Sequence, residues 1–587
     1  MTATAPSARP FRCPFPRLLR LACALLLMVS TSDLLAQEDA AALEFHRQQE
    51  RERQLRQQQE PRPDVRLQDV SPSSARLPRD EHPCFPIRRI VLTGVEAERF
   101  QWLADHTGRA EDGHPDPAIG ACLGTGGVNL VMRRLQNALI ERGYITTRIL
   151  AAPQDLSTGT LHLTVVPGRI HAVRFLPDAS GQMPSRATHW NALPAAADDL
   201  LNLRDIEQAL ENFKRLPSVE ADLQIAPSED AAATPGDSDL LITWQQTFPF
   251  RLTLSADDSG TQASGRHQGA ATVAFDNWWT LNDLFYITHS QSLFTDGTVR
   301  GTRGYTVHYS LPLGYSLLAL TTSHNTYHQT VAGLNGAVRY DGVNDTGDLR
   351  LSHILHRTAA GKTHVFLRGW QRASSNFTDD EEVLVQRRRM GGWEAGAGHR
   401  AFIGQATLEG TVAYRRGTGA FDALPAPEEA RGAMAEGTAR PRLWTADLQF
   451  NQPFRVGREA FRYGTSLRAQ WNGTPLVPQD RFAIGGRYTV RGFDGELVLA
   501  AERGWFVRND LGWQIGGQEL YLGLDHGAVA GRSAAQLLGR TLTGAVIGLR
   551  GGGSALSYDL FTGTPVARPE GFQAARTVAG FSITWTL

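Results

Sequence analysis

The chain has 587 residues, more than one ordinary domain holds, so we expect several domains. Its formal net charge of -1 excludes a bulk electrostatic attraction to nucleic acid. Hydrophobic residues make up 41% of the chain and the mean hydropathy is -0.28. No apolar run of about 18 residues follows the N-terminus, which excludes helical membrane spans. A transmembrane β-barrel remains compatible with this composition, because its strands alternate lipid-facing and lumen-facing residues.

The first 36 residues have the pattern of a secretory signal peptide. Several arginines precede an apolar run from Leu21 to Val29, and Ala36 suits cleavage. The apolar run is too short to anchor the chain across about 30 Å of hydrocarbon. Arg20, just before Cys23, argues against a lipid anchor on that cysteine. We therefore expect residues 1–36 to be removed on export.

Residues 37–60 favour a helix, since they are rich in Ala, Gln, Arg and Glu. Leu43, Phe45 and Leu55 form no apolar stripe that could dock the helix on a core. Composition alone favours a frayed, solvated tail. The alternative is a polar helix inside a water-filled lumen, where about 23 residues would span ~34 Å. An extended linker over residues 61–83 follows, marked by Pro61, Pro63, Pro72, Pro78 and Pro83.

Two small α+β units follow, over residues 84–168 and 169–246. Each has the order strand, helix, strand, strand, read from apolar periodicity. In the first unit the predicted elements are strand 87–92, helix 128–139 and strands 145–150 and 161–165. In the second they are strand 170–176, helix 203–213 and strands 219–225 and 240–244. Such units expose a sheet edge to which an incoming segment can add a strand, although they could also be mere spacers.

Cys84 and Cys122 are the two cysteines of the mature chain. An even pair in an exported protein predicts one disulfide. Closing this loop is worth about 3 to 4 kcal/mol in the chain-entropy model. A metal site would need further ligands near these cysteines, so we expect no metal.

From residue 247 to residue 587 the chain consists of short alternating segments separated by glycine-rich turns. One face of a predicted strand carries Tyr463, Thr465, Leu467, Ala469 and Trp471, and the other carries Arg462, Gly464, Ser466, Arg468 and Gln470. Two arginines on the buried face of a soluble sandwich would be prohibitive, but a hydrated lumen tolerates them. About 340 residues suffice for roughly 16 strands. We predict a transmembrane antiparallel β-barrel.

The most specific stretch is Phe482-Ala-Ile-Gly-Gly-Arg-Tyr-Thr-Val-Arg-Gly-Phe493, in which Arg491 projects from a glycine-rich loop. Arg508 and Asp525 follow on the next predicted strands. A guanidinium presents a planar fork of donors, so Arg491 suits a charge-assisted pair with Asp525. If the loop folds into a lumen, as the family resemblance given below implies, this pair would tether it. The alternative is an exposed ion pair worth about 0 to 1 kcal/mol. The supporting residues of this predicted clasp are Gly485, Gly486, Val490, Gly492, Phe493, Arg508 and Gly527.

The chain from about residue 81 onward resembles a known family of membrane pores. The phrases that carry the resemblance are His82-Pro-Cys-Phe-Pro-Ile87, Leu139-Ile-Glu-Arg-Gly-Tyr144, Leu201-Asn-Leu-Arg-Asp-Ile-Glu-Gln208, Asp276-Asn-Trp-Trp-Thr-Leu-Asn-Asp283, Tyr558-Asp-Leu-Phe-Thr-Gly-Thr-Pro565 and the arginine loop. Together they resemble the two-partner secretion (TpsB) transporters of the ShlB/FhaC/HecB family, in the Omp85 superfamily. Leu587 departs from the final Phe of many outer-membrane barrels.

The resemblance implies a Gram-negative outer-membrane pore that exports a large unfolded exoprotein of the TpsA type, with two POTRA domains in the periplasm. It also implies that residues 37–60 are a plug helix, which reverses the preference from composition. Outer-membrane lipid would be a partner, as would the barrel assembly machinery and periplasmic chaperones during biogenesis. No cofactor and no nucleic acid are implied.

The sequence disfavours two other classes of function. An enzyme is disfavoured, because Gly361-Lys362-Thr363 lacks the first glycine of a P-loop and the 17 histidines are scattered. We find no nucleophile paired with a base. A closer alternative is an assembly factor that inserts other barrels, but such proteins usually carry more POTRA domains and no plug helix.

Overall fold

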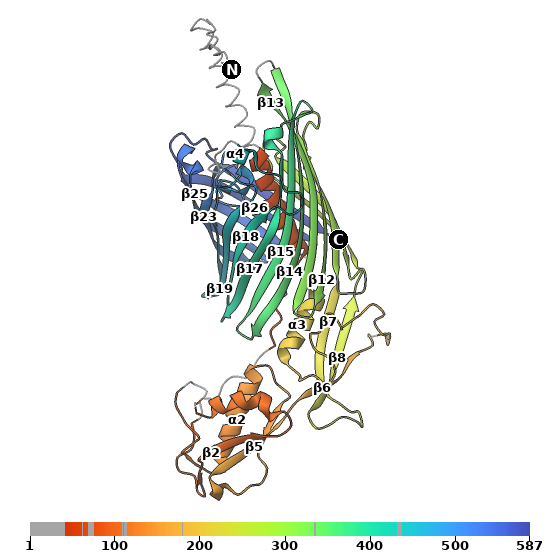
Figure 1. Cartoon of the computed structure of the whole chain (residues 1–587), viewed down its shortest axis with the longest axis vertical. Coiled ribbons are helices and arrows are strands. Elements are labelled where there is room, and N and C mark those ends of the chain that lie inside the picture. Colours follow the sequence, from red (N-terminus) through yellow and green to blue (C-terminus); the bar gives the residue numbers. More distant parts are fainter. Residues whose placement is uncertain are drawn as a thin grey trace, which may run out of the picture.

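The computed structural model describes residues 41–60, 63–67, 76–108, 110, 114–178, 180–333, 336–430, 437–553 and 555–587. The predicted signal peptide, residues 37–40 and parts of the linker therefore lie outside the described residues. A tall barrel stands above two small domains in Figure 1. Among the described helices, none is long and apolar enough to cross a membrane.

The first unit, at the far end from the barrel, packs α2 (Thr125–Glu141) on a small sheet (Figure 1). The sheet has the order β2-β5-β4, with β2 and β5 parallel and β4 antiparallel to β5. The bounds are β2 Arg89–Thr93, β4 Arg148–Leu150 and β5 Thr160–Val166, with a 3-10 helix η1 at Ala97–Gly108. Leu135, Leu139 and Leu161 are fully buried between helix and sheet. Strand β4 is shorter than predicted.

A disulfide joins Cys84 to Cys122, as predicted. Cys84 directly precedes β1 (Phe85–Pro86) and Cys122 begins β3 (Cys122–Leu123), and these two strands pair antiparallel. Just before the disulfide, Glu81 accepts hydrogen bonds from the amides of Gly124 (2.8 Å) and Gly126 (2.6 Å) at the start of α2. The end of the linker is thus fixed to the first unit by a covalent bond and by a carboxylate at a helix N-terminus.

The second unit repeats the arrangement beside the barrel. Its elements are β6 Arg169–Phe175, α3 Leu203–Lys214, β7 Val219–Pro227 and β8 Asp237–Gln246, and its sheet has the order β6-β8-β7. Ile206, Leu210 and Phe213 of α3 are buried against that sheet. The predicted order of strand, helix, strand, strand is therefore confirmed in both units.

Buried polar side chains join the second unit to the barrel. Arg215, just after α3, donates to the carbonyl of Asn282 at 2.8 Å and to Ser310 Oγ at 2.5 Å. Asn191 accepts from Asn282 Nδ2 at 2.9 Å and donates to the carbonyl of Pro312 at 3.2 Å. These bonds satisfy polar groups that water does not reach, so separating the two bodies would leave several of them unpaired.

The prediction of a sixteen-strand antiparallel barrel is confirmed within the described residues. One two-residue strand, β16 (Glu381–Glu382), adds to the long strands. The long strands are β9 Phe250–Asp257, β10 His267–Asp276, β11 Leu284–Leu293, β12 Gly301–Leu313, β13 Ser316–Gly333, β14 Gly336–Thr358, β15 Gly361–Thr378, β17 Arg388–Ile403, β18 Ala406–Thr418, β19 Arg442–Val456, β20 Glu459–Asn472, β23 Arg503–Ile515, β24 Gln518–Ala530, β25 Thr541–Gly552, β26 Leu556–Ala567 and β27 Val578–Thr586. Pairing of β27 with β9 closes the sheet.

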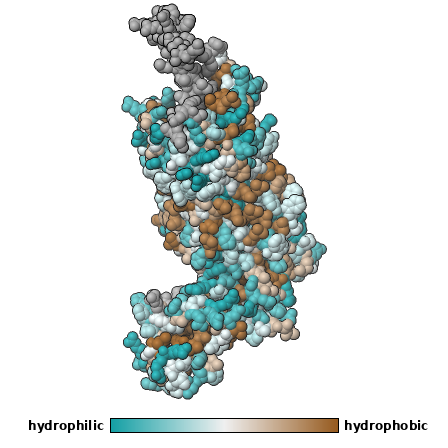
Figure 2. Space-filling view, in the orientation of Figure 1, coloured by the Kyte–Doolittle hydropathy of each residue, from teal (hydrophilic) through white to brown (hydrophobic). Residues whose placement is uncertain are grey.

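The two faces of the barrel differ as the alternation predicts. On β20, Tyr463 and Trp471 are exposed on the outer face, whereas Arg462 pairs with Glu519 at 2.7 Å inside. Figure 2 shows hydrophobic residues gathered in a band over the middle of the visible barrel wall, with more hydrophilic surface above the band. Such an apolar outer band is what a barrel embedded in lipid requires.

Candidate functional site: the barrel lumen

A helix occupies the lumen of the barrel. Residues 41–59 are helical, and we call them the lumen helix. Its polar side chains bond to the wall on several sides: Gln48 to Asn344 (3.1 Å), Glu50 to Arg468 (2.7 Å), Glu52 to Asn325 (3.0 Å) and Arg56 to Thr321 (3.0 Å). These partners lie on β13, β14 and β20. The helix therefore needs no apolar stripe, because a polar wall surrounds it.

The loop between β20 and β23 also folds into the barrel. This segment, residues 473–502, is called the clasp loop here. Its short strands β21 (Phe482–Ile484) and β22 (Leu499–Ala501) pair antiparallel and form the stem. Apolar residues of the loop pack against Phe506, Val529 and Leu542 of the wall. The loop is thus anchored by an apolar cluster as well as by its charged tip.

Arg491, at the tip of the clasp loop, meets Asp525 of β24. Its Nε donates to Asp525 Oδ2 at 2.7 Å, its Nη2 to Oδ1 at 2.8 Å, and its backbone amide to Oδ2 at 3.0 Å. Arg491 is 3% exposed and Asp525 has no exposed surface. The pair is bidentate and desolvated, which is the strong form of an arginine–carboxylate contact. Arg508 Nε lies 3.8 Å from the same carboxylate.

The other predicted residues of the clasp lie around this pair. Val490 and Phe493 are buried, and the Phe493 ring meets Phe572 edge to face at 5.9 Å. Gly492 has a φ of +95°, and a Cβ there would lie 2.5 Å from the carbonyl oxygen of Thr564. A larger residue at 492 would therefore be strained in its backbone and would push the loop off the wall.

The remaining glycines of the prediction contribute differently. A Cβ on Gly527 would meet Val490 Cγ2 at 2.9 Å, so this position lets the loop approach β24. The amides of Gly485 and Gly486 both donate to Thr489 Oγ1, at 3.1 and 3.2 Å. The nearest atom to a Cβ on Gly486 lies 3.6 Å away, so sterics do not require glycine there.

Sequence reasoning missed the rest of the charged network around Arg491. Asp510 Oδ1 accepts from Arg491 Nη2 at 2.5 Å, and Arg550 Nη1 lies 3.2 Å from Asp510 Oδ2. Arg550 also lies 4.5 Å above the ring of Tyr521. The signal that could have found them is the alternation in β23 and β24, which places Asp510 and Tyr521 on the same face as Asp525.

Sequence reasoning also missed Gly544, on β25. A Cβ at this position would lie 1.7 Å from the carbonyl oxygen of Arg491, which leaves no room for any side chain. The alternating pattern of β25 does not indicate this requirement for glycine, because the backbone that approaches Gly544 belongs to the clasp loop and not to a neighbouring strand.

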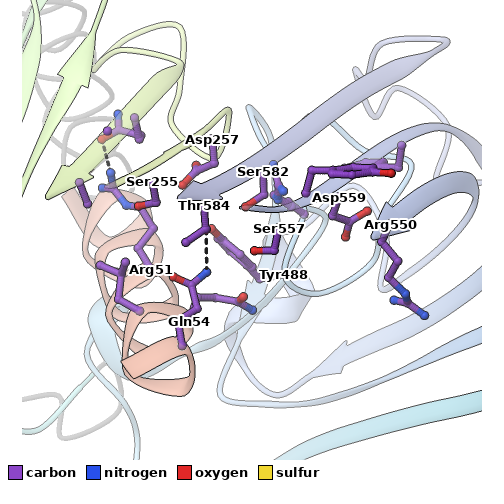
Figure 3. Close-up of a pocket in the computed structure, with 18 of the residues that line it drawn as sticks. Arg51, Gln54, Ser255, Asp257, Tyr488, Arg550, Ser557, Asp559, Ser582 and Thr584 are labelled. Carbon is purple, nitrogen blue, oxygen red and sulfur yellow. Dashed lines mark hydrogen bonds between the residues drawn. The ribbon is translucent and has the colours of Figure 1, made fainter. Parts of the chain in front are cut away.

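The lumen helix and the clasp loop touch each other and leave a cavity between them and the wall. Arg47 donates to the carbonyl of Gly495 in the loop. The cavity has a volume of about 530 Å³. In Figure 3, Arg51 and Gln54 of the helix lie near Ser255 and Thr584 of the wall, with Tyr488 of the loop beside them. A polar cavity of this size holds water rather than an apolar ligand.

The fold and the lumen together define a class: a transmembrane β-barrel with an internal helix, an inward-folded loop and two small α+β domains. Family models specify it further. The model described as "Haemolysin secretion/activation protein ShlB/FhaC/HecB" matches residues 236–551, and models of POTRA domains match residues 85–168 and 169–227. The chain belongs to this haemolysin secretion/activation family, which confirms the resemblance seen in the sequence.

Individual relatives agree with the family match. The chain is 34% identical to the outer membrane transporter CdiB-2 of Burkholderia pseudomallei (strain 1026b), over 92% of each chain. It is 23% identical to the hemolysin transporter protein ShlB of Serratia marcescens, over 75% of this chain and 74% of that protein. This protein is therefore an outer-membrane protein, with its POTRA domains in the periplasm.

Solved structures show the same architecture. CdiB from Acinetobacter baumannii is 30% identical with a TM-score of 0.80, and the match covers 94% of this chain and 99% of that one. CdiB from Escherichia coli is 25% identical with a TM-score of 0.79 and the same coverage.

Proposed function

We propose that this chain recognises a large unfolded partner protein in the periplasm and exports it through the barrel lumen. The observation that carries the proposal is the lumen helix, which contacts strands around the wall through polar side chains. A helix with its side chains is about 10 to 12 Å wide, so a lumen that holds one has room for an extended chain once the helix leaves.

The proposal keeps the division of the chain expected from the sequence. Its parts are the signal peptide 1–36, plug helix 37–60, linker 61–83, POTRA domains 84–168 and 169–246, and barrel 247–587. The POTRA domains would take up the exported chain by strand addition at a sheet edge. The relatives are transporters by name, which supports translocation rather than catalysis.

The clasp has a structural role in this proposal. Arg491 and Asp525 would hold the clasp loop against β24 while the plug helix moves, so that the loop does not collapse into the path of the exported chain. The bidentate contact and its burial support this role. Folding of the exported protein outside the cell would supply direction, since no nucleotide is needed in the mechanism.

The test is a strain that lacks this chain, compared with the same strain carrying it on a plasmid. Proteins in the medium and in the outer membrane are both quantified by mass spectrometry. Export predicts that one large protein disappears from the medium while the other outer-membrane proteins keep their levels. A general fall of outer-membrane proteins would instead point to an assembly factor and would refute the proposal.

A further inference from the structure

Part of the linker lies extended on helix α3 of the second POTRA domain. The amide of Val65 donates to Glu211 Oε1 at 3.1 Å, and the amide of Leu67 donates to Glu207 Oε1 at 2.9 Å. Amides two residues apart point to the same side of an extended chain. The two carboxylates, one helical turn apart, therefore bind the backbone amides of the linker and not its side chains.

Two cationic side chains of the barrel also take part in binding the linker. Arg357, at the end of β14, donates through Nη2 to the carbonyl of Val65 at 2.7 Å and to Glu211 Oε1 at 2.9 Å. Its Nε donates to Glu207 Oε2 at 3.1 Å, and Lys362 Nζ lies 3.1 Å from Glu211 Oε2. Both carboxylates are buried, and they are neutralised by these two cations together with Arg204, which lies 2.8 Å from Glu207 Oε1.

The side chains of the docked linker divide between two surroundings. Val65 and Leu67 are partly buried and pack against the apolar core of the second POTRA domain. Arg66, between them, is exposed and lies 4.3 Å above the ring of Phe402. The surface therefore accepts a segment with apolar residues at alternate positions, and its other contacts place few requirements on the sequence of that segment.

We propose that this surface of α3, Arg357 and Lys362 is a docking site for an extended stretch of the exported polypeptide, occupied at rest by residues 64–67 of the chain's own linker. The inference rests on the proposed export function. Its recognition uses backbone bonds and two alternate apolar side chains, features that an unfolded protein offers and that a folded one hides.

The length of the linker couples this site to the lumen. The described helix of 19 residues (41–59) is about 28 Å long at 1.5 Å per residue. Only residues 60–63 separate it from Asp64, and the five chain steps from residue 59 to residue 64 span at most about 17 Å. Asp64 is itself held by Lys362 at 3.2 Å. The C-terminal end of the helix therefore stays within about 17 Å of this site while residues 64–67 are docked, and release of the linker widens the range over which the helix can move.

The experiment measures binding of a fluorescent peptide with the sequence of residues 61–70 to the full-length protein in detergent, by anisotropy. In the wild type the tethered linker competes at a high effective concentration, so the peptide binds weakly. Val65→Pro/Leu67→Pro removes the two amide donors of the linker and empties the site. We expect the peptide to bind this variant at least about tenfold more tightly, because each lost bond is to a charged acceptor.

The matched control is Arg66→Pro, which adds a proline at a residue whose amide donates no hydrogen bond recorded in the described part of the chain. This variant keeps the amide donors of Val65 and Leu67 and loses only the contact of Arg66 with Phe402, so its gain in peptide binding should be much smaller than that of the double-proline variant. Adding Glu207→Gln/Glu211→Gln to the double-proline variant should abolish the gain. Equal binding to wild type and double-proline variant, or binding to neither, would overturn the proposal. Heat-modifiable migration on gels establishes that each barrel is folded.

A second peptide keeps only the apolar residues at the positions of Val65 and Leu67 and changes all the others. Competition by this peptide supports the assignment to an exported chain of unspecified sequence, whereas competition only by the linker's own sequence overturns that assignment. Neither binding experiment depends on export. A failure of the proposed export function in cells would therefore be distinguished from a failure of peptide binding.

Discussion

Three donors of a single residue, Arg491, converge on the carboxylate of Asp525, which has no contact with solvent. Removing the guanidinium would leave this buried negative charge with the more distant Arg508, 3.8 Å away, in place of a bidentate partner. The cost of stranding one partner of a buried pair is about 3 to 5 kcal/mol. This cost falls on the position of the clasp loop, because the barrel strands are held by their own backbone ladder.

We predict that Arg491→Ala leaves the barrel inserted in the outer membrane but reduces export several-fold. Arg491→Lys should restore only part of the export, since an ammonium cannot form the bidentate fork. Arg416→Ala, at an exposed arginine of β18, is the control for loss of one positive charge. Export is measured by immunoblot of the medium and insertion by heat-modifiable migration. Normal export by Arg491→Ala would refute the role of the clasp.

A second prediction concerns close approach rather than charge. Gly544→Ala would place a methyl group against the carbonyl of Arg491, so we expect the loop to be displaced and cleaved faster by protease added to intact cells. Gly404→Ala is a matched control, because no atom lies within 4 Å of a Cβ there, although its φ of +60° carries a small backbone cost. Equal cleavage of Gly544→Ala and wild type would contradict the close contact.

The sequence could predict the pairing of Arg491 with Asp525. One charged residue lies in a glycine-rich loop and the other in an alternating strand, and both require a hydrated barrel interior. The sequence could not predict that Asp510 and Arg550 join them. Which lumen-facing charges meet depends on the stagger between neighbouring strands, and composition does not encode that stagger.

Among the elements, the lumen helix shows most directly where local sequence patterns stop being informative. Its composition predicts a helix, but a polar helix without an apolar stripe is equally compatible with full exposure to solvent. Only the wall around it, with partners such as Arg468 and Asn344, provides a place for it. The alternation of Val65 and Leu67 with Asp64 and Arg66 is typical of an extended segment with one buried side. It spans only four residues of a proline-rich linker, so the sequence alone does not distinguish it from an exposed linker.

If the lumen helix must leave for export, fixing it to the wall should stop export. Gln48→Cys/Asn344→Cys places two thiols where side chains now bond at 3.1 Å. Cys84 and Cys122 are joined in a disulfide. Cys13 and Cys23 belong to the predicted signal peptide, so after its removal a short bifunctional thiol reagent reacts only with the new pair. We expect export to fall to background after cross-linking, and each single-cysteine variant to continue exporting. Undiminished export from fully cross-linked protein would show that the helix does not obstruct the path.

The docked linker should respond to acid. Burial raises the pKa of Glu211, but the bonds from Arg357 and the charge of Lys362 outweigh burial and hold this pKa below its ordinary value. A carboxyl whose pKa is lower in the folded state stabilises that state above its unfolded pKa of about 4.3, and this stabilisation is lost as the pH falls further. Glu207 and Asp64 face the same cations.

We therefore expect the linker to detach as the pH falls below about 4. A fluorophore on Arg66→Cys reports the change. This cysteine is the only free thiol expected once the predicted signal peptide, with Cys13 and Cys23, is removed. Adding Glu211→Gln should weaken docking at neutral pH and flatten the acid response. An unchanged signal between pH 7 and pH 3 in the parent would contradict the role of the carboxylates.

At the scale of the whole molecule, the width of the lumen limits what can pass. A folded domain of 100 residues has a radius of gyration of about 13 Å, whereas an extended chain is narrower than a helix. We predict that an exported protein carrying a stably folded insert stalls in the pore, and that a destabilised mutant of the same insert passes. Protease accessibility on both sides of the membrane detects the stalled chain. Unhindered passage of the stable insert would refute export in an unfolded state.

The way in which the lumen helix is held has a consequence for the resting pore. Its contacts with the wall are chiefly ion pairs and polar bonds in a space that water reaches, such as Glu50 with Arg468. Dissolved ions screen such contacts, with a Debye length of about 10 Å at 0.1 M and about 3 Å at 1 M. Concentrated electrolyte should therefore loosen the helix, and the current through a single pore should rise faster than the conductivity of the bath.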